Sequence, residues 1–338
     1  MTGTGPFAGW TAEGSGWFPV TDAGCVGVVR RAAEALAGQL NLSADRVGEL
    51  ALVSTELTTN LHRHAVDGVV HVRSVRCGGA RGVELVAIDS GPGMADLAVS
   101  TRDGHSTSGS LGIGLGAIHR QATRVDGYSR TGRGTVLAAS VWSEPPPAPL
   151  ADGLVRPIAG ETASGDGYAV RGDSGHLQAM LCDGLGHGPL AALAAERASA
   201  AFGSAPSGGP RLVLEHLHRR LARTRGAVAA VVDLVRDVVR FAGLGNIRAW
   251  LAGPTGRRGM TSLPGIVGHH YQEIKEFEYR LPPGGVVILH TDGLNDRWDL
   301  ASYPGLLDRL PLLVAATLLR DAGGRRDDAG VLVAKAAA

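Results

Sequence analysis

The sequence predicts a two-domain protein of the α/β (α+β) class. Its 338 residues exceed the length of one ordinary domain, and its composition, 44% hydrophobic and 19% charged, is globular. Three consecutive prolines at 145–147 stiffen the chain between two regions with different motifs. We expect a flexible tail over 1–17, a first domain over 18–143, a Pro-rich linker over 144–157 and a second domain over 158–338.

The charge and cysteine content exclude several classes of site. A net charge of +1 gives no basic field that would attract nucleic acid or an anionic membrane. Lys275 and Lys335 are the only lysines, and neither follows a glycine-rich turn, so a GxxxxGK[ST] phosphate loop is absent. Cys25, Cys77 and Cys182 are odd in number and lack CxxC spacing, which indicates reduced thiols rather than disulfides or a zinc site.

No targeting or membrane segment is evident. Residues 1–17 are rich in Gly and Thr and lack the basic and apolar regions of a signal peptide. No uninterrupted apolar run reaches the ~18 residues that would span a bilayer. We therefore expect a cytoplasmic protein.

The first domain is expected to contain helices packed on strands. Ser43 is placed to cap a helix, and Asp45 in its first turn favours the helix dipole. Apolar and small residues then recur at three- and four-residue steps from Val47 to Leu61, which predicts a core-facing stripe. The expected helices cover 22–40, the segment after Ser43 and 116–122, and the expected strands cover 69–75, 83–89 and 135–142.

The second domain is expected to be richer in strands. Short β-rich segments alternate with turn signals, and the Gly/Ser/Pro-rich stretch 203–210 indicates a loop. The expected strands cover 168–170, 178–183, 227–234, 238–243, 286–290 and 331–333, and the expected helices cover 189–201 and 211–223.

Three groups of residues in the first domain predict a nucleotide site. Glu56, Asn60 and His64 are spaced by four and share one helix face, where a carboxylate and an amide can position water and a phosphate-bound cation. Asp89 ends an apolar strand and can accept from an exocyclic amine, while the following Gly91 and Gly93 let the backbone bend round a flat ring.

A glycine-rich turn completes this set. Gly112, Gly114 and Gly116 stand at the start of a helix, where unhindered N–H groups and the positive end of the dipole favour phosphate. Each of the three groups alone is a weak signal, because a lone GxGxG is more often a turn and a lone His is more often structural. Their order and spacing together indicate ATP binding.

Together these motifs resemble the GHKL ATPase superfamily, especially the small serine kinases and anti-sigma factors of the RsbW and RsbT type. The resemblance covers about 18–142 and includes the closing segment 132–136. It implies a Bergerat-type α/β sandwich that binds ATP with Mg²⁺. The implied roles are Asn60 as Mg²⁺ ligand, Glu56 as general base, Asp89 as adenine reader, Gly91, Gly93 and Thr135 as further nucleotide contacts, Gly112, Gly114 and Gly116 as phosphate wrap, and 94–108 as a lid.

Aspartates beside glycines recur in the second domain. Asp166, Asp183 and Asp292 each lie at or near a strand end, and Gly184 can add a backbone carbonyl. Hard dications prefer such oxygen ligands. One Asp-Gly pair is better explained as a turn, but several in one domain predict a metal site. The adjacent pair Asp327 and Asp328 precedes a strand and can reach the same edge, while His187 between two glycines remains either a functional group or a turn residue.

These motifs resemble the SpoIIE and RsbX branch of the PPM metal-dependent serine/threonine phosphatases, over about 163–334. The resemblance implies an αββα sandwich with two Mn²⁺ or Mg²⁺ ions between its sheets. Asp166 and Asp183 would bridge the ions, and Asp292 and Asp327 would hold the second ion. The last motif lacks the hydroxyl residue that commonly follows it, so whether Asp327 or Asp328 ligates stays open.

The two motif sets predict a bacterial partner-switching regulator. The second domain would dephosphorylate phosphoserine or phosphothreonine on a STAS-type antagonist protein, and the first would phosphorylate the same class of partner. The alternative is that the first domain is a non-catalytic, ATP-gated binding module that sequesters a sigma factor or STAS protein and regulates the phosphatase. Mn²⁺ versus Mg²⁺ and the formation of a homodimer stay open.

Overall fold

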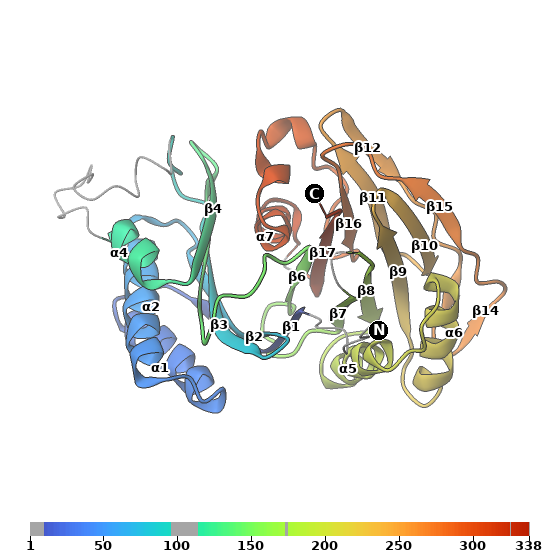
Figure 1. The fold of residues 1–338 in the computed structure, drawn as a ribbon, viewed down its shortest axis with the longest axis horizontal. Helices are drawn as coiled ribbons and strands as arrows, with labels where there is room; N and C mark the ends of the chain where they lie inside the picture. Colours follow the sequence, from blue (N-terminus) through green and yellow to red (C-terminus); the bar gives the residue numbers. More distant parts are fainter. Residues whose placement is uncertain (1–9, 96–113, 173–174, 325, 338) are drawn as a thin grey trace, which may run out of the picture. The chain divides into compact units, whose positions relative to one another are not determined.

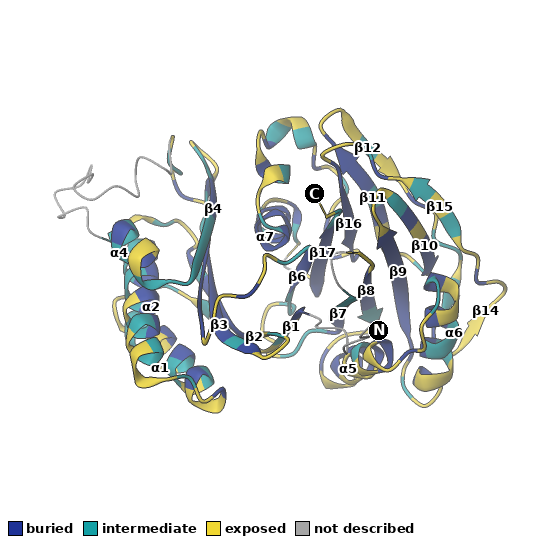
Figure 2. Ribbon diagram, viewed as in Figure 1, coloured by how far each residue is buried: buried dark blue, intermediate teal, exposed yellow. Residues whose placement is uncertain are grey.

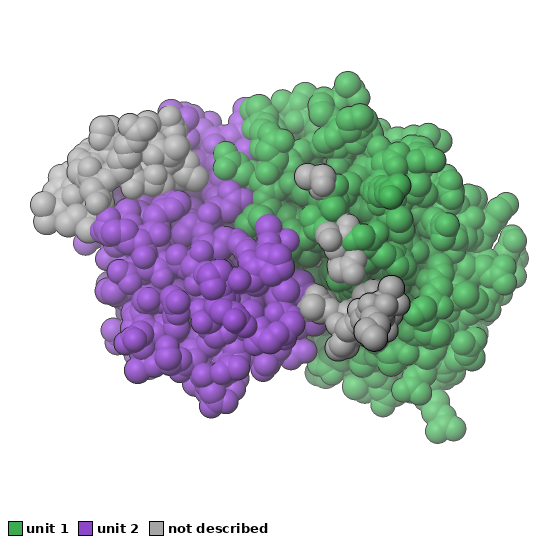
Figure 3. All heavy atoms as spheres, viewed as in Figure 1, with its two compact units in different colours: residues 1–9, 149–338 green, residues 10–148 purple. Residues whose placement is uncertain are grey.

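The computed structural model describes residues 10–95, 114–172, 175–324 and 326–337. The chain divides into two compact units, Trp10–Ala148 and Pro149–Ala338, which Figure 3 distinguishes by colour. This division falls inside the expected linker 144–157. Within the described ranges, no helix is long and apolar enough to cross a membrane.

The first unit is an α/β sandwich. Among its described residues, five strands form one antiparallel sheet in the order β1-β2-β3-β5-β4, and three helices pack together against one face of that sheet (Figure 1). The elements are β1 (Trp10–Pro19), α1 (Gly24–Gln39), α2 (Ala44–His64), β2 (Val69–Cys77), β3 (Ala80–Ile88), α4 (Gly114–Gln121), β4 (Arg124–Arg130) and β5 (Gly134–Trp142).

Helix α2 forms where its sequence predicts. The Ser43 hydroxyl accepts a hydrogen bond from the Arg46 N–H at 3.4 Å, and Asp45 lies in the first turn. Leu50, Leu57 and other members of the predicted stripe are buried against α1 and the sheet. Where α2 meets the start of α4, it presents the polar side chains of Glu56 and Asn60.

The second unit is an αββα sandwich. One antiparallel sheet has the order β15-β10-β9-β8-β7 and carries α5 and α6, and the other has the order β12-β11-β16-β17-β6 and carries α7 (Figure 1). Its elements are β6 (Ala151–Arg156), β7 (Asp166–Gly172), β8 (Leu177–Gly184), α5 (Pro189–Gly203), α6 (Pro210–Leu221), β9 (Ala227–Val235), β10 (Val238–Leu244), β11 (Arg248–Gly253), β12 (Gly256–Gly259), β13 (Gly265–Ile266), β14 (His270–Tyr271), β15 (Phe277–Arg280), β16 (Val286–His290), η1 (Leu300–Ser302), η2 (Leu306–Asp308), α7 (Pro311–Ala322) and β17 (Ala329–Lys335).

Alternation along the strands separates two cores in this unit. On β8, Leu181 faces the space between the sheets, whereas Met180 and Cys182 face the helices. On the second sheet, Leu289 and Leu332 face inward and meet the first sheet. Figure 2 shows that the buried residues follow the central strands of both sheets. The same alternation decides which way the polar residues at the strand ends point.

Two boundary predictions are wrong. The tail expected over 1–17 is a strand from Trp10 onward, because β1 pairs with β2 from Trp10↔Cys77 to Pro19↔Val69. The linker expected over 144–157 contains β6, which pairs with β17 and completes the second sheet. Strand β6 therefore belongs to the second unit, although it precedes the expected start at residue 158.

Candidate functional site

Each unit contains one group of converging polar residues. In the first unit we define the nucleotide cradle as Glu56, Asn60, Asp89, Gly114 and Thr135. Of the other predicted contacts, Gly112 lies outside the described residues, as does the part of the expected lid from residue 96 to 108.

Helices α2 and α4 bring one side of the cradle together. Gly114 begins α4 so close to α2 that a Cβ atom there would lie 3.0 Å from Glu56 Oε2 and 3.3 Å from Asn60 Oδ1. A side chain at this position would crowd both groups, and each would have to shift by a few tenths of an ångström. Gly114 therefore lies beside the carboxylate–amide pair, although 54 residues separate it from Asn60 in the sequence.

The strand ends form the other side of the cradle. Asp89 Oδ1 accepts the Gly91 N–H at 2.7 Å, and the Asp89 N–H donates to the Thr135 carbonyl at 2.9 Å. The Thr135 hydroxyl lies 2.9 Å from Ser129 Oγ. A Cβ on Gly91 would lie 3.1 Å from the His64 carbonyl oxygen, which places the end of α2 against the Asp89 turn. The predicted nucleotide residues therefore gather in one region, while the His64 side chain is exposed.

Two glycines permit this turn. Gly134 has φ +83°, and a Cβ there would lie 2.0 Å from the Asp89 carbonyl oxygen. Gly93 has φ +64°, and its Cβ would lie 2.0 Å from the Arg130 carbonyl oxygen. Any other L-residue would both strain the backbone and collide with it. The absence of side chains at these glycines thus allows strand β5 and the Asp89 turn to approach each other closely.

In the second unit, five aspartates gather at one end of the sandwich. We call this set the carboxylate cluster: Asp166, Asp183, Asp292, Asp327 and Asp328. Asp166 opens β7 and is the register partner of Asp183 near the end of β8. The other three flank the end of β16 and the start of β17, which pair with His290 opposite Val331. Four strand ends from two sheets therefore supply the cluster.

The two central carboxyls have strongly perturbed acidities. Burial, together with the Asp183 charge, raises the pKa of Asp166 well above its ordinary value. Burial, followed by the charges of Asp292 and Asp327, raises the pKa of Asp183 to about 7. These carboxyls stand close enough to repel one another. Such an arrangement favours either a proton or a cation between them.

Thr291 connects the cluster across the sandwich. Its hydroxyl donates to Asp166 Oδ2 at 2.7 Å and accepts the Gly330 N–H at 2.9 Å. The strand alternation explains this, because Thr291 follows Leu289 by two residues and points between the sheets. A Cβ on Gly330 would come within 3.1 Å of the same Asp166 oxygen, so glycine leaves room for it. Thr291 is a site residue for which the sequence alone predicts no role.

The neighbouring aspartates of the last motif have different surroundings. Asp328 is buried, and its two oxygens accept the N–H groups of Ile158 and Gly165, each at 2.7 Å. Asp327 is exposed, and one of its oxygens accepts the Asp328 N–H at 2.9 Å. Partial desolvation raises the pKa of Asp327, with the charges of Asp292 and Asp328 adding to the effect. Asp328 thus holds the chain before β7 in place, whereas Asp327 faces outward.

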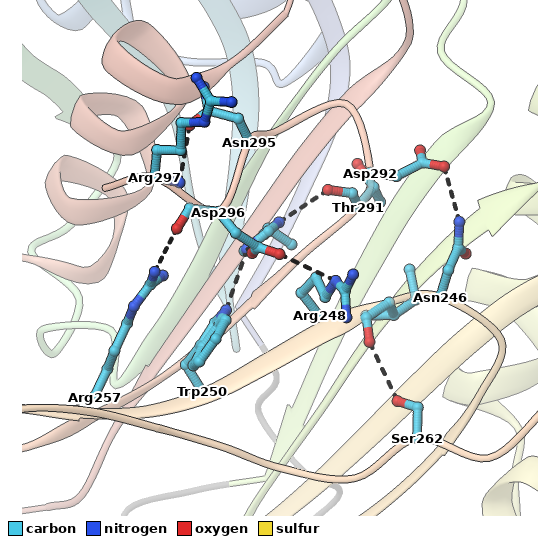
Figure 4. A network of polar contacts seen from close by, with 12 residues as sticks. Asn246, Arg248, Trp250, Arg257, Ser262, Thr291, Asp292, Asn295, Asp296 and Arg297 are labelled. Carbon is cyan, nitrogen blue, oxygen red and sulfur yellow. Dashed lines mark hydrogen bonds and ion pairs between the residues drawn. The ribbon is translucent and has the colours of Figure 1, made fainter. Parts of the chain in front are cut away.

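The remaining predicted groups lie at the rim. Asp292 Oδ2 accepts a hydrogen bond from the Asn246 side chain at 2.8 Å, as Figure 4 shows. His187 is exposed and lies 3.9 Å from Glu161, which is a weak surface contact. Among the residues described, no three acidic, His or Cys side chains are close enough to form a finished metal cage. The cluster is therefore a gathering of carboxylates whose repulsion a cation would relieve.

Comparisons with known proteins match both units. The model of the histidine kinase-like ATPase domain matches residues 18–141, and the model of stage II sporulation protein E (SpoIIE) matches residues 173–336. The serine/threonine-protein kinase RsbT of Bacillus subtilis is 35% identical over 88 residues, covering 26% of this chain and 66% of RsbT. The phosphoserine phosphatase RsbX of the same organism is 27% identical over 140 residues, covering 40% of this chain and 70% of RsbX.

A solved structure is also similar to this chain. A protein from the bacterial stressosome, described as a modular system adapted to control secondary messenger signaling, is 31% identical to this chain. It covers 55% of this chain and 98% of its own length, with a TM-score of 0.50. The observed α/β sandwich and αββα sandwich are the folds that the two resemblances imply. The chain therefore joins a GHKL-like, histidine kinase-type ATPase domain to a SpoIIE-type phosphatase domain of the PPM class.

Proposed function

We propose that this chain is a partner-switching regulator whose second unit hydrolyses phosphoserine or phosphothreonine on a STAS-type antagonist protein. The observation that carries this is the convergence of carboxylates from four strand ends, two of them with strongly raised pKa values. The name of the relative RsbX, a phosphoserine phosphatase, supports the reaction class. The similarity to RsbT and to a stressosome protein supports the class of pathway.

The cluster suits two Mn²⁺ or Mg²⁺ ions. Carboxylate and carbonyl oxygens are the ligands that these hard cations prefer, and the repulsion between the aspartates would be offset by their charge. Asp166 and Asp183, with the Gly184 carbonyl, would hold the ions together, and Asp292 and Asp327 would complete the set. When bound, the ions would supply Lewis acidity toward the phosphoryl group and lower the pKa of a water.

Asp327, rather than Asp328, is the ligand in this proposal. Both oxygens of Asp328 already accept backbone N–H groups, and the residue is buried. Removing it would leave the N–H groups of Ile158 and Gly165 without their acceptors. Asp327 is exposed and lies close enough to raise the pKa of Asp183. We expect Asp327→Asn to lose activity with normal stability, whereas Asp328→Asn also lowers the Tm.

The residues around the metals have separate tasks. Thr291 donates to Asp166 and so fixes which Asp166 oxygen can face a cation. Asn246 similarly orients Asp292. Neither side chain carries a charge, so each acts by positioning a carboxylate.

Phosphate release from a phosphorylated STAS protein tests the phosphatase. Wild-type protein with Mn²⁺ should release phosphate, and Asp183→Asn should not. Asp237→Asn is the matched control, because Asp237 is an exposed aspartate of the same unit that pairs with Arg280 at 2.9 Å. Undiminished release by Asp183→Asn, under conditions where Asp237→Asn is normal, contradicts the metal site.

For the first unit we propose binding of ATP with Mg²⁺ in the nucleotide cradle. Asn60 would hold the Mg²⁺, Glu56 would act as general base, and Asp89 with Thr135 would surround the adenine. The close approach of Gly114 to Glu56 and Asn60 supports this arrangement. The similarity to the kinase RsbT supports phosphorylation of a protein serine or threonine.

Label transfer from ATP discriminates a kinase from a binding module. Transfer to a STAS protein that disappears in Glu56→Ala, while ATP still binds, supports the kinase. ATP binding without transfer in the wild type supports the sequestering module instead. If ATP changes the phosphatase rate of the wild-type chain but not that of Asn60→Ala, the cradle regulates the second unit.

A further inference from the structure

The surface beside Asp292 is hollowed by a cavity of about 270 Å³. It is lined by two stretches of chain, residues 245–250 and residues 259–262. Asn246 belongs to this wall and donates to Asp292 Oδ2 at 2.8 Å. One end of the cavity therefore adjoins the carboxylate cluster, and whatever occupies the cavity lies next to the site of phosphate hydrolysis.

Hydrogen bonds and stacking hold the walls in shape. The Ser262 hydroxyl donates to the Ile247 carbonyl at 3.2 Å and so joins the two stretches. The Trp250 indole N–H donates to His290 Nε2 at 3.3 Å, and the Arg257 guanidinium stacks 4.1 Å from the Trp250 ring. Figure 4 shows this network around the strand β11. A wall fixed in this way loses little conformational entropy when a ligand binds.

Arg248 supplies a positive charge on the cavity wall. Its side chain is 61% exposed, and its Nε lies 3.2 Å from Asp296 Oδ2. The guanidinium has five N–H donors, so the contact at Nε leaves the terminal nitrogens for another acceptor. Among the residues that the structure describes, Asp296 is the one ionic partner of Arg248. This arrangement orients the cation without neutralising its outer edge.

We propose that Arg248 reads an acidic side chain of the protein substrate, close in sequence to the phosphorylated residue. The inference rests on the proposed phosphatase function and adds a substrate preference to it. Asn246 and Arg248 are two residues apart, a span of at most ~7 Å. An extended peptide covers the same distance in about two residues. A phosphoserine at the carboxylate cluster would therefore place an Asp or Glu about two positions away at Arg248.

A phosphopeptide series tests this preference. The full chain with Mn²⁺ is given peptides that carry Asp, Asn or Lys at successive positions on either side of one phosphoserine, and kcat/KM is measured. We expect Asp to be preferred over Asn by roughly fivefold at one position, as for a partly exposed ion pair, and Lys to be disfavoured. The preference should weaken with added salt because the charges are near the surface.

The Asp-to-Asn ratio within each variant separates recognition from structural damage. In Arg248→Gln the ratio should fall to about one, whereas in Arg240→Gln, an exposed arginine on β10, it should stay at the wild-type value. A wild type with no acidic preference overturns the proposal. So does an Arg248→Gln variant that is slower on every peptide with an unchanged ratio, because Arg248 would then only hold Asp296. Failure of the wild type to hydrolyse any peptide, or p-nitrophenyl phosphate, refutes the phosphatase function itself.

Discussion

Removing one charge from the carboxylate cluster should stabilise the metal-free protein. Burial, followed by the charges of Asp292 and Asp327, raises the pKa of Asp183 from its ordinary 3.8 to about 7. A carboxyl whose pKa is raised by folding stabilises the fold fully below the unfolded pKa, and this stability is lost as pH rises through the folded pKa. At pH 8 the ionised carboxylate lowers the free energy of unfolding by at most about 4 kcal/mol. Because the group is only half-buried, solvent screening reduces this cost to about 2 kcal/mol.

Asp183→Asn replaces the charge with an amide of the same shape. We expect the Tm of the unit Pro149–Ala338 to rise by about 4–8 °C at pH 8, because about 2 kcal/mol is spread over a domain of this size. At pH 4.5 most of the gain should disappear, since the native Asp183 is then protonated in the wild type. Calorimetry of the full chain with a chelator at both pH values measures the difference.

The order of stability should reverse when metal is added. Mn²⁺ should raise the Tm of the wild type by binding the folded state and should leave Asp183→Asn nearly unchanged. Asp237→Asn, outside the cluster, should follow the wild type in both conditions. The reasoning is refuted if Asp183→Asn is no more stable than the wild type at pH 8 without metal, or if its gain does not depend on pH.

Two further substitutions test single contacts. Thr291→Val removes a hydroxyl with two hydrogen bonds, and we expect a loss of about 1–3 kcal/mol in unfolding free energy and about tenfold weaker Mn²⁺ binding, measured by thermal unfolding and by titration calorimetry. Gly134→Ala should cost at least about 3 kcal/mol and abolish ATP binding, because its Cβ collides with the Asp89 carbonyl. Gly132→Ala, with φ +75° and no atom within 4 Å, should cost only about 1 kcal/mol, so equal effects at Gly132 and Gly134 would contradict the role of the collision.

The sequence predicts elements whose local signals agree with their packing. Helix α2 has a cap at Ser43, an acidic first turn and a regular apolar stripe, and it forms over Ala44–His64 as these signals indicate. Strands such as β9, whose residues are nearly all buried and apolar, are equally clear. The Asp-Gly motifs at strand ends also predict that the aspartates meet, because antiparallel pairing brings those ends to one edge.

Other features depend on contacts that no local pattern encodes. Strand β1 contains two glycines within Trp10–Pro19 and has a weak strand propensity, yet pairing with β2 orders it. Helix α7 is buried on almost every side, so it lacks the polar face that marks an amphipathic helix. The distinct surroundings of Asp327 and Asp328 arise from the N–H groups of distant segments, which adjacency in the sequence cannot reveal.

The pairing of β6 with β17 limits when the second unit can fold during synthesis and where the chain can be divided into fragments. Residues 151–156 can pair in the second sheet only after residues 329–335 have been synthesised. This sheet therefore cannot be completed early on the ribosome. A fragment that begins after Pro157 would expose an unpaired edge of β17 and invite aggregation. Dissection of the two activities should therefore cut the chain before Pro149.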